Sequence, residues 1–139
     1  MFTKKTIEFP FRYVHLPFIG EVFYPFVPIF LKTIKGWREF DFLVDTGADF
    51  TTLPRRAEEM LGINLSQCRE TIAEGIGGIK VKIWEAKIPI RIKNFETKIR
   101  CSITEDDKTP FLLGRVDLLE THFSWHFDAK AKKIIFEFV

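Results

Sequence analysis

The sequence has little cysteine, and the cysteines that it has form no metal or redox motif. Cys68 and Cys101 stand far apart and outside any CxxC or Cys/His cluster. This excludes the usual zinc-binding and dithiol patterns, so we expect two buried, reduced thiols and no metal or other cofactor.

Blocks of like charge are also missing. The 21 basic residues nearly balance the 19 acidic ones, and neither sign collects into a run longer than a few residues. Because binding to nucleic acid requires a basic patch or stripe, no nucleic-acid partner is expected.

No apolar segment suits a transmembrane helix. The apolar residues 22–31 are too few to cross a bilayer and include two prolines, and a signal peptide would place its apolar region closer to Met1. A cytoplasmic protein without membrane insertion is therefore expected. A peripheral membrane contact through the Phe-rich N-terminal region stays open, although phenylalanines in a β-rich chain more often serve in the core and in interfaces.

Apolar and polar residues alternate along most of the chain, which is typical of half-buried strands and predicts an all-β fold. Residues 40–44 are one example. Between residues 79–83 and 88–92 the apolar phase switches, which predicts a bulge or bend near Glu85–Ala86.

Turn residues divide these strands at Lys35–Gly36, at Lys93–Asn94 and at residues 128–130. Two short helices are predicted, at residues 54–61 with Gly62 as the C-terminal cap, and at residues 115–121.

The two ends of the chain are strand-like and apolar. Residues 7–9 and 134–139 would form adhesive edges if they were left unpaired. Pairing with a second copy would cover them, so the ends favour an oligomer.

Asp45 stands where an apolar run ends and a turn begins. It follows Phe42-Leu43-Val44 and precedes Thr46-Gly47, so a carboxylate is held at the end of a buried strand by a turn that requires a small residue. For an isolated Asp-Thr-Gly, the favoured explanation is an Asp that merely caps the turn by accepting hydrogen bonds from nearby amides.

Two further elements accompany this tripeptide. Residues 74–79, Glu-Gly-Ile-Gly-Gly-Ile, predict a movable hairpin tip, although a plain flexible β-turn explains them equally well. Residues 110–117 predict a short apolar strand, a glycine and an arginine that opens a helix. Because Arg115 opposes the helix dipole there, it needs a specific partner, for which Asp49 is a candidate, or else it is an unpaired surface residue.

Three motifs follow one another along the chain: Asp-Thr-Gly-Ala-Asp at residues 45–49, Gly-Ile-Gly-Gly at residues 75–78 and Leu-Leu-Gly-Arg at residues 112–115. In this order they resemble the retropepsin-like, or retroviral-type, aspartic protease family, including its cellular and bacterial members. The resemblance implies an all-β, single-domain closed or orthogonal β-barrel of the acid-protease type, with one or two short helices and a flap hairpin, in a homodimer. The domain covers residues 1–139, and residues 1–25 are an N-terminal extension without an assigned role.

The resemblance also implies the site residues. Asp45, Thr46 and Gly47 match the catalytic motif, with Asp45 as the catalytic carboxylate and Thr46 as the residue that locks two active-site loops together. Asp49 and Arg115 resemble the pair that braces this loop. The residues expected to contact the substrate are Ala48, Asp49, Gly75, Ile76, Gly77 and Gly78, with Ile79 and Leu53 in the walls of its pockets.

Peptide hydrolysis by this chemistry needs two carboxylates, one acting as base and the other as acid. The chain has one Asp-Thr-Gly, so the second carboxylate must come from a second copy across a two-fold axis. The predicted function is an aspartic endopeptidase, active as a homodimer on peptide or protein substrates. The main alternative is a catalytically weak or inactive dimer of this fold that binds peptides or proteins. A second alternative is a structural protein whose Phe-rich ends drive association.

Overall fold

The structure, a computed structural model, describes residues 5–75 and 77–139, and strands make up most of them. The strands are β1 (Thr6–Pro10), β2 (Arg12–Leu16), β3 (Gly20–Tyr24), β4 (Phe26–Thr33), β5 (Gly36–Val44), β6 (Thr51–Leu53), β7 (Glu70–Glu74), β8 (Lys80–Ile92), β9 (Phe95–Thr104), β10 (Leu112–Leu113), β11 (Phe123–Asp128) and β12 (Lys133–Phe138). Between them lie the short helical segments α1 (Ala57–Leu61), η1 (Leu65–Gln67) and η2 (Arg115–Leu119). The predicted all-β fold is confirmed.

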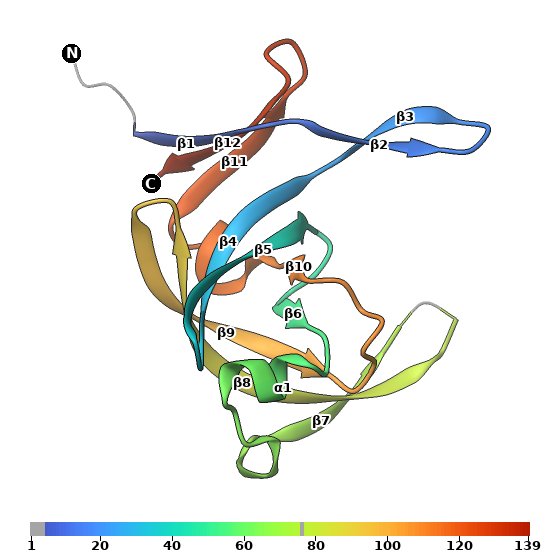
Figure 1. Cartoon of the computed structure of the whole chain (residues 1–139), viewed down its shortest axis with the longest axis vertical. Coiled ribbons are helices and arrows are strands. Elements are labelled where there is room, and N and C mark those ends of the chain that lie inside the picture. Colours follow the sequence, from blue (N-terminus) through green and yellow to red (C-terminus); the bar gives the residue numbers. More distant parts are fainter. Residues whose placement is uncertain (1–4, 76) are drawn as a thin grey trace.

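Six strands close into a barrel in the order β4-β5-β10-β6-β9-β8. β8 completes the ring by pairing with β4, where Leu31 lies opposite Ile90. Figure 1 shows this barrel in the lower part of the molecule, with the terminal strands above it. The predicted closed barrel is therefore confirmed.

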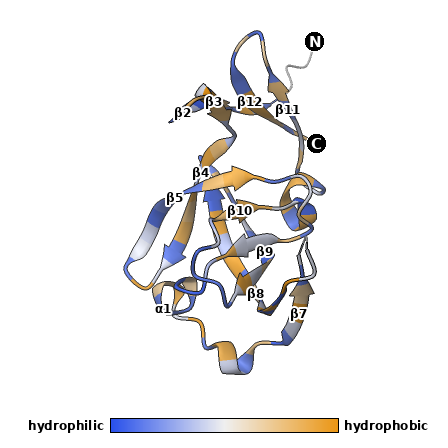
Figure 2. Ribbon diagram, turned by 90° about the vertical axis from the view of Figure 1, so that its right-hand side faces the viewer, coloured by the Kyte–Doolittle hydropathy of each residue, from blue (hydrophilic) through white to orange (hydrophobic). Residues whose placement is uncertain are grey.

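Alternating apolar residues fill the barrel. In β4, the side chains of Val27, Ile29 and Leu31 are completely buried, while the residues between them are half-buried. Phe42 and Val44 continue the core from β5, and Figure 2 shows that the last part of β5 is hydrophobic. The core therefore extends to the residue that precedes Asp45.

β8 runs without interruption through the position where the sequence predicts a bulge. Its ladder with β9 is continuous over residues 83–92, so of the bulge or bend predicted near Glu85–Ala86, the bulge is wrong. The apolar phase changes because the strand changes its surroundings: the first part pairs with β7 in a hairpin that leaves the barrel. The second part belongs to the barrel wall, where it buries Ile88, Ile90 and Ile92.

The two ends of the chain pair with each other. β12 is the central strand of a three-stranded sheet, with β1 on one side and β11 on the other. Ile7 lies opposite Phe136, Phe9 lies opposite Ile134, and all four side chains are buried. The expectation that the terminal strands await a second copy is therefore wrong, because an apolar edge is covered equally well from within the same chain.

β2 and β3 form a two-stranded hairpin of their own, which we call the arm (Arg12–Tyr24). The arm projects from the top of the barrel, away from both other sheets (Figure 1). The predicted N-terminal extension at residues 1–25, which the sequence leaves without a role, contains β1 of the terminal sheet and the whole of the arm within its described part, residues 5–25.

The helix predicted at residues 54–61 is shorter in the structure. The regular helix α1 begins only at Ala57, whose N–H donates to the carbonyl of Pro54 in a preceding turn. Gly62 ends it with a left-handed φ of +67°, as predicted for a C-terminal cap.

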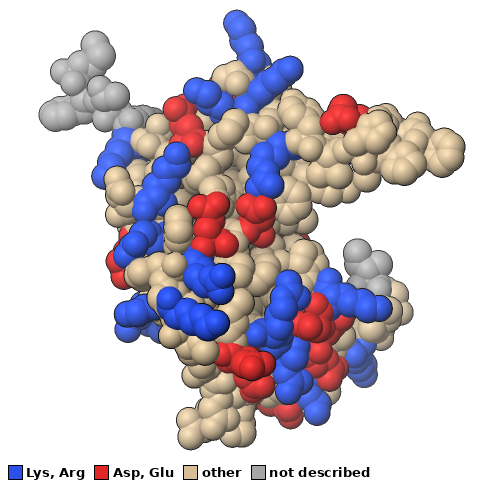
Figure 3. All heavy atoms as spheres, in the orientation of Figure 1, with Lys and Arg blue, Asp and Glu red and all other residues tan. Residues whose placement is uncertain are grey.

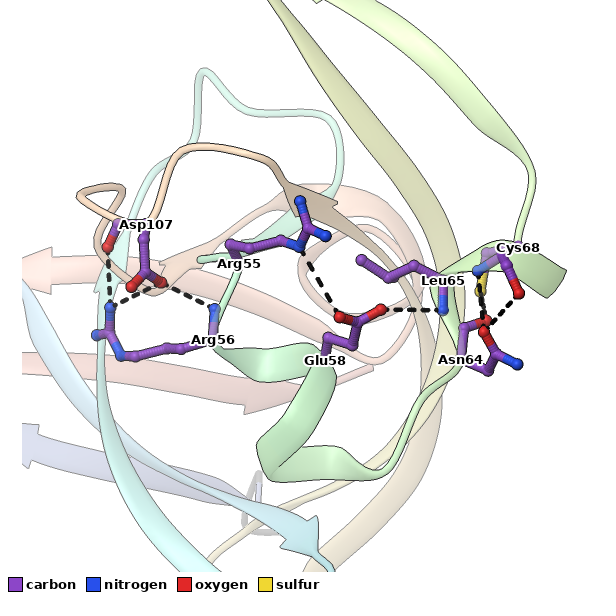
Figure 4. Close-up of polar contacts among 8 residues, drawn as sticks. Arg55, Arg56, Glu58, Asn64, Leu65, Cys68 and Asp107 are labelled. Carbon is purple, nitrogen blue, oxygen red and sulfur yellow. Dashed lines mark hydrogen bonds and ion pairs between the residues drawn. The ribbon is translucent and has the colours of Figure 1, made fainter.

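Polar contacts fix α1 to the neighbouring loops (Figure 4). The N–H of Arg56 donates to Asp107 Oδ1 at 2.8 Å, and its guanidinium donates to the carbonyl of the same residue at 3.0 Å. On the other side, Glu58 accepts a 3.2 Å hydrogen bond from the N–H of Leu65. The helix is thereby tied to the loop after β9 and to η1.

Basic and acidic side chains are interspersed over the face shown in Figure 3. Within the described ranges, no helix has the length and apolar character needed to cross a membrane. Cys101 is buried, and burial raises the pKa of its thiol to about 12. Cys68 is only partly buried, so the expectation of a buried thiol is wrong for that residue.

Candidate active site

Asp45 is the first residue after β5. Its N–H donates to the carbonyl of Leu113 at 2.9 Å, and its own carbonyl accepts from Ala48 at 3.2 Å. One carboxylate oxygen accepts a 3.0 Å hydrogen bond from the N–H of Gly47, so the side chain caps its own turn. Asp45 is nevertheless partly exposed, which leaves its carboxylate accessible to a reacting group.

Two parallel strands bring the loops that follow them together. Leu113 of β10 lies opposite Val44 of β5, so the residues after each strand meet at the same end. A glycine is required next in the chain, because a Cβ on Gly114 would lie 2.4 Å from the carbonyl carbon of Phe50. The N–H of Gly114 donates at 3.1 Å to Oγ1 of Thr51, which is completely buried.

Arg115 holds the Asp45 loop through both its side chain and its backbone. Nη2 donates to Asp49 Oδ1 at 2.5 Å, and Nη1 donates to the carbonyl of Thr46 at 2.6 Å. The N–H groups of Arg115 and Val116 donate to the carbonyls of Ala48 and Asp49 at 3.1 and 2.8 Å. Four hydrogen bonds therefore fix a loop of only a few residues, which makes it a rigid support for a reacting group.

The segment after Gly114 is not a regular helix. Val116 has an extended backbone with ψ of 136°, and Asp117 has a left-handed φ of +68°, so the helix predicted at residues 115–121 is wrong over its first turn. The dipole argument that required a partner for Arg115 does not apply here, yet Asp49 lies beside it.

A second ion pair fixes the other end of this segment. Asp117 accepts hydrogen bonds from Nε and Nη2 of Arg100 at 2.8 and 2.9 Å, and from the N–H of the same residue at 2.9 Å. These bonds lower the pKa of Asp117 to about 2. Because both carboxylate oxygens are occupied by Arg100, Asp117 is poorly suited to serve as a second reacting carboxylate.

The glycine-rich segment forms the tip of the β7–β8 hairpin. The N–H of Gly75 donates to the carbonyl of Ile79 at 2.9 Å, and Gly77 and Gly78 have φ values of +88° and +76°. Ile79 is 67% exposed, whereas Ile76 lies outside the described residues. The tip therefore presents an apolar side chain to solvent on a backbone that needs glycine.

The structure brings residues 45–49 and Arg115 into one cluster, while the tip of the β7–β8 hairpin, the predicted flap, stands apart on the same side of the molecule (Figure 1). Leu53, which the sequence suggests as a pocket wall, is completely buried in the core, so that suggestion is wrong. Among the described residues, no three His, Cys, Asp or Glu side chains are grouped so that they could hold a metal ion.

Sequence reasoning missed two residues that support the site. Thr51 binds the N–H of Gly114, and Arg100 binds Asp117. A threonine at the start of a strand and an arginine in an alternating strand carry no local signal. The path of β10 beside β6 brings Gly114 to Thr51, and the packing of η2 against β9 brings Asp117 to Arg100.

A family model described as aspartyl protease matches residues 32–116, which is more than half of the chain. The chain belongs to the aspartyl protease family. No curated protein sequence matches it.

Solved structures share its fold. A retropepsin-like aspartic protease from Rickettsia conorii aligns with a TM-score of 0.65 at 22% identity, covering 94% of this chain and 98% of that one. EIAV protease complexed with the inhibitor HBY-793 aligns with a TM-score of 0.54 at 24% identity, covering 77% of this chain and 92% of that one. The predicted retropepsin-like fold is therefore confirmed.

Proposed function

We propose that this chain is an aspartic endopeptidase that acts as a homodimer, in which each subunit contributes the carboxylate of Asp45. The Asp45 loop is the observation that carries this proposal. A carboxylate that only caps a turn needs the N–H of Gly47 and nothing more. Here the same loop is also held by the side chain and backbone of Arg115, although Asp45 itself stays partly exposed.

The second carboxylate has to come from a second copy. The sequence contains one Asp-Thr-Gly, and both carboxylate oxygens of Asp117, in the segment after β10, accept hydrogen bonds from Arg100. A two-fold axis beside the Asp45 loop would place two identical carboxylates face to face. A single subunit is then inactive because it holds half of the site.

The chemistry follows from two carboxylates close to each other. In aspartic proteases generally, two like charges about 3 Å apart cannot both ionise, so the pair holds one proton. The ionised Asp45 takes a proton from water, the water oxygen attacks the peptide carbonyl carbon, and the other Asp45 donates its proton to the carbonyl oxygen. The first Asp45 then gives its proton to the amide nitrogen, the second takes a proton from a hydroxyl of the tetrahedral intermediate, and the C–N bond breaks without an acyl-enzyme.

The substrate would lie extended between the Asp45 loop and the flap. Residues 47–49 form the floor, and the flap tip with Gly75, Gly77 and Gly78 covers the peptide from the other side. An extended peptide pairs with exposed backbone groups as an added strand. Ile79, which is largely exposed in the single chain, is suited to contact an apolar side chain of that peptide.

Cleavage of a mixed peptide library tests the proposal. We expect cleavage by the wild type and none by Asp45→Asn, with both proteins dimeric by sedimentation. Asp128→Asn, which changes a carboxylate at the end of β11 that accepts a hydrogen bond from the turn to β12, is the matched control and should cleave normally. Equal cleavage by the wild type and Asp45→Asn would show that the activity comes from elsewhere.

The same experiment addresses the binding-module alternative. If the wild type dimerises, binds peptides and cleaves none of them between pH 3 and 8, the fold serves as a peptide-binding module. Titration of a bound peptide against Asp45→Asn would then show whether the carboxylate takes part in binding.

A further inference from the structure

The arm emerges from the barrel directly beside the Asp45 loop. The residue after β3, Pro25, accepts a 2.9 Å hydrogen bond from the N–H of Val44, which precedes Asp45. Arg12 at the start of the arm forms a 2.7 Å ion pair with Asp41 of β5. The root of the arm is therefore fixed to the strand that carries the candidate catalytic residue.

The root is also packed firmly on its other side. Phe11 and Phe23 stack with ring centroids 3.8 Å apart, and Phe127 of β11 contacts both rings edge-on. An isolated two-stranded hairpin is marginally stable in water. This root gives the arm a fixed direction, although its outer half has no partner strand apart from its own two strands.

The outer half of the arm has one apolar face and one polar face. In the register of β2 and β3, Val14 pairs with Val22 on the face that carries Arg12, whereas His15 pairs with Glu21 on the opposite face. His15 and Glu21 also form a 2.8 Å hydrogen bond. Because Arg12 reaches Asp41 of the barrel, the apolar face is the one turned toward the barrel side.

The tip of the arm is apolar and conformationally strained. Phe18 is fully exposed and Ile19 is 72% exposed. The N–H of Ile19 donates to the carbonyl of Leu16 at 3.3 Å, with Pro17 and Phe18 in the middle of the turn.

Phe18 has a φ of +70° in this turn, which bulky side chains rarely adopt and which glycine adopts without strain. Within a single chain, the phenylalanine adds strain to the turn and exposes an aromatic ring to water.

The position of the arm identifies what would cover it. Figure 1 shows the arm and the flap hairpin projecting on the same side, with the loop after β5 between them, and Figure 3 shows a hollow between the two projections. A second copy that places its own Asp45 opposite this one must enter that hollow. The terminal strands pair within the chain, and in the proposed function the flap hairpin covers the substrate, so the arm is the projection suited to hold that copy.

We propose that the arm clasps a second copy of this chain, with Phe18 and Ile19 seated on the surface of that copy and the Val14 and Val22 face covered by it. The proposal rests on the proposed function, since the need for a second Asp45 places the second copy. By two-fold symmetry, each subunit clasps the other, so two arms contribute to one interface.

Phe18→Gly tests the arm, because glycine removes the ring and also suits the positive φ of the turn. We expect the dissociation constant of the dimer to rise by about tenfold or more in sedimentation equilibrium, as for a central aromatic contact of an interface. The urea stability of the dissociated subunit should equal or exceed that of the wild type. At enzyme concentrations that restore the dimer, kcat should return to the wild-type value.

Ile34→Ser is the matched control. Ile34 is 67% exposed but lies in the turn between β4 and β5, next to α1, so the dissociation constant should stay unchanged. If Phe18→Gly also leaves the dissociation constant within about twofold of the wild type, the arm does not clasp the second copy, and the proposed protease function stands.

Two other outcomes separate the proposals further. A dimer that is weakened by Phe18→Gly but cleaves no peptide supports the arm and overturns the protease. If the dissociation constant is unchanged and Phe18 is instead needed for co-sedimentation with phosphatidylglycerol vesicles, the tip contacts lipid and the proposal is overturned.

Discussion

Arg115 Nη1 donates a 2.6 Å hydrogen bond to the backbone carbonyl of Thr46, the residue next to Asp45. The same guanidinium binds the carboxylate of Asp49 at the far end of the loop. One planar side chain thus spans the loop that carries the candidate catalytic residue. Only arginine offers several donors at fixed angles for such a bridge.

Arg115→Lys should therefore lower activity more than it lowers stability. A lysine keeps the charge but cannot reach the Thr46 carbonyl and the Asp49 carboxylate together. We expect kcat/KM to fall by about 100-fold, because a small misplacement of reacting groups has a large effect on rate. The loss of unfolding free energy in urea should be about 1–2 kcal/mol. A variant with unchanged kcat/KM would show that the bridge does not position Asp45.

Gly114→Ala should disrupt the same region through packing. A Cβ at this position would lie 2.4 Å from the carbonyl carbon of Phe50, so the backbone of β6 or of the loop must shift. We expect a loss of about 2–4 kcal/mol in unfolding free energy, typical of overpacking in a region that cannot relax.

Gly75→Ala is the control for this substitution. A Cβ on Gly75 would lie 3.9 Å from the carbonyl oxygen of Ile79, an ordinary van der Waals distance, and Gly75 is not among the glycines with positive φ. Its unfolding free energy should stay within about 1 kcal/mol of the wild-type value. Equal losses in the two variants would contradict the close approach of Gly114 to Phe50.

Much of this site could be predicted from the sequence because its parts are local. The Asp-Thr-Gly after an apolar strand and the glycine-rich tip are each short segments, and the residues that form each turn lie within the segment itself. The Arg115–Asp49 contact is long-range, and the sequence indicated it through a helix dipole that the structure does not contain.

The features that the sequence did not predict depend on how distant segments meet. The terminal strands look like unpaired edges until β1 and β12 are seen side by side. The phase switch in β8 looks like a bulge because periodicity reports which face is buried, but not what buries it. Nothing in the sequence around Phe18 indicates its positive φ, since the turn is set by the pairing of β2 with β3.

Asp117→Asn should lower stability at neutral pH and have little effect in acid. The Arg100 hydrogen bonds hold the pKa of the folded carboxyl at about 2, below its ordinary value of 3.8. Because the folded pKa is the lower one, the stabilisation is present above about pH 4 and is lost as pH falls toward 2.

Urea unfolding at a series of pH values measures this effect. The wild type should be more stable than Asp117→Asn at pH 7, and the difference should shrink between about pH 4 and pH 2. Asparagine tolerates the left-handed φ of this position, so the backbone is not the source of the change. A difference that is constant over this range would mean that the ion pair contributes nothing.

Gly77→Val should impair turnover more than folding. Gly77 has a φ of +88° at the flap tip, with no neighbouring atom within 4 Å of a Cβ placed there. A β-branched residue resists this φ, so the tip changes shape without a clash in the core. If the flap closes over the substrate, kcat/KM should fall by about tenfold or more.

Gly36→Val is the matched control, since Gly36 has a φ of +97° and the same open surroundings, but is the first residue of β5, directly after the turn from β4. Both variants should lose a similar amount of unfolding free energy, about 1–2 kcal/mol. Only Gly77→Val should lose activity, because only its strain lies in the hairpin that we propose closes over the Asp45 loop. Equal activity losses in the two variants would mean that general destabilisation causes the loss, and that the β7–β8 hairpin does not act as a flap.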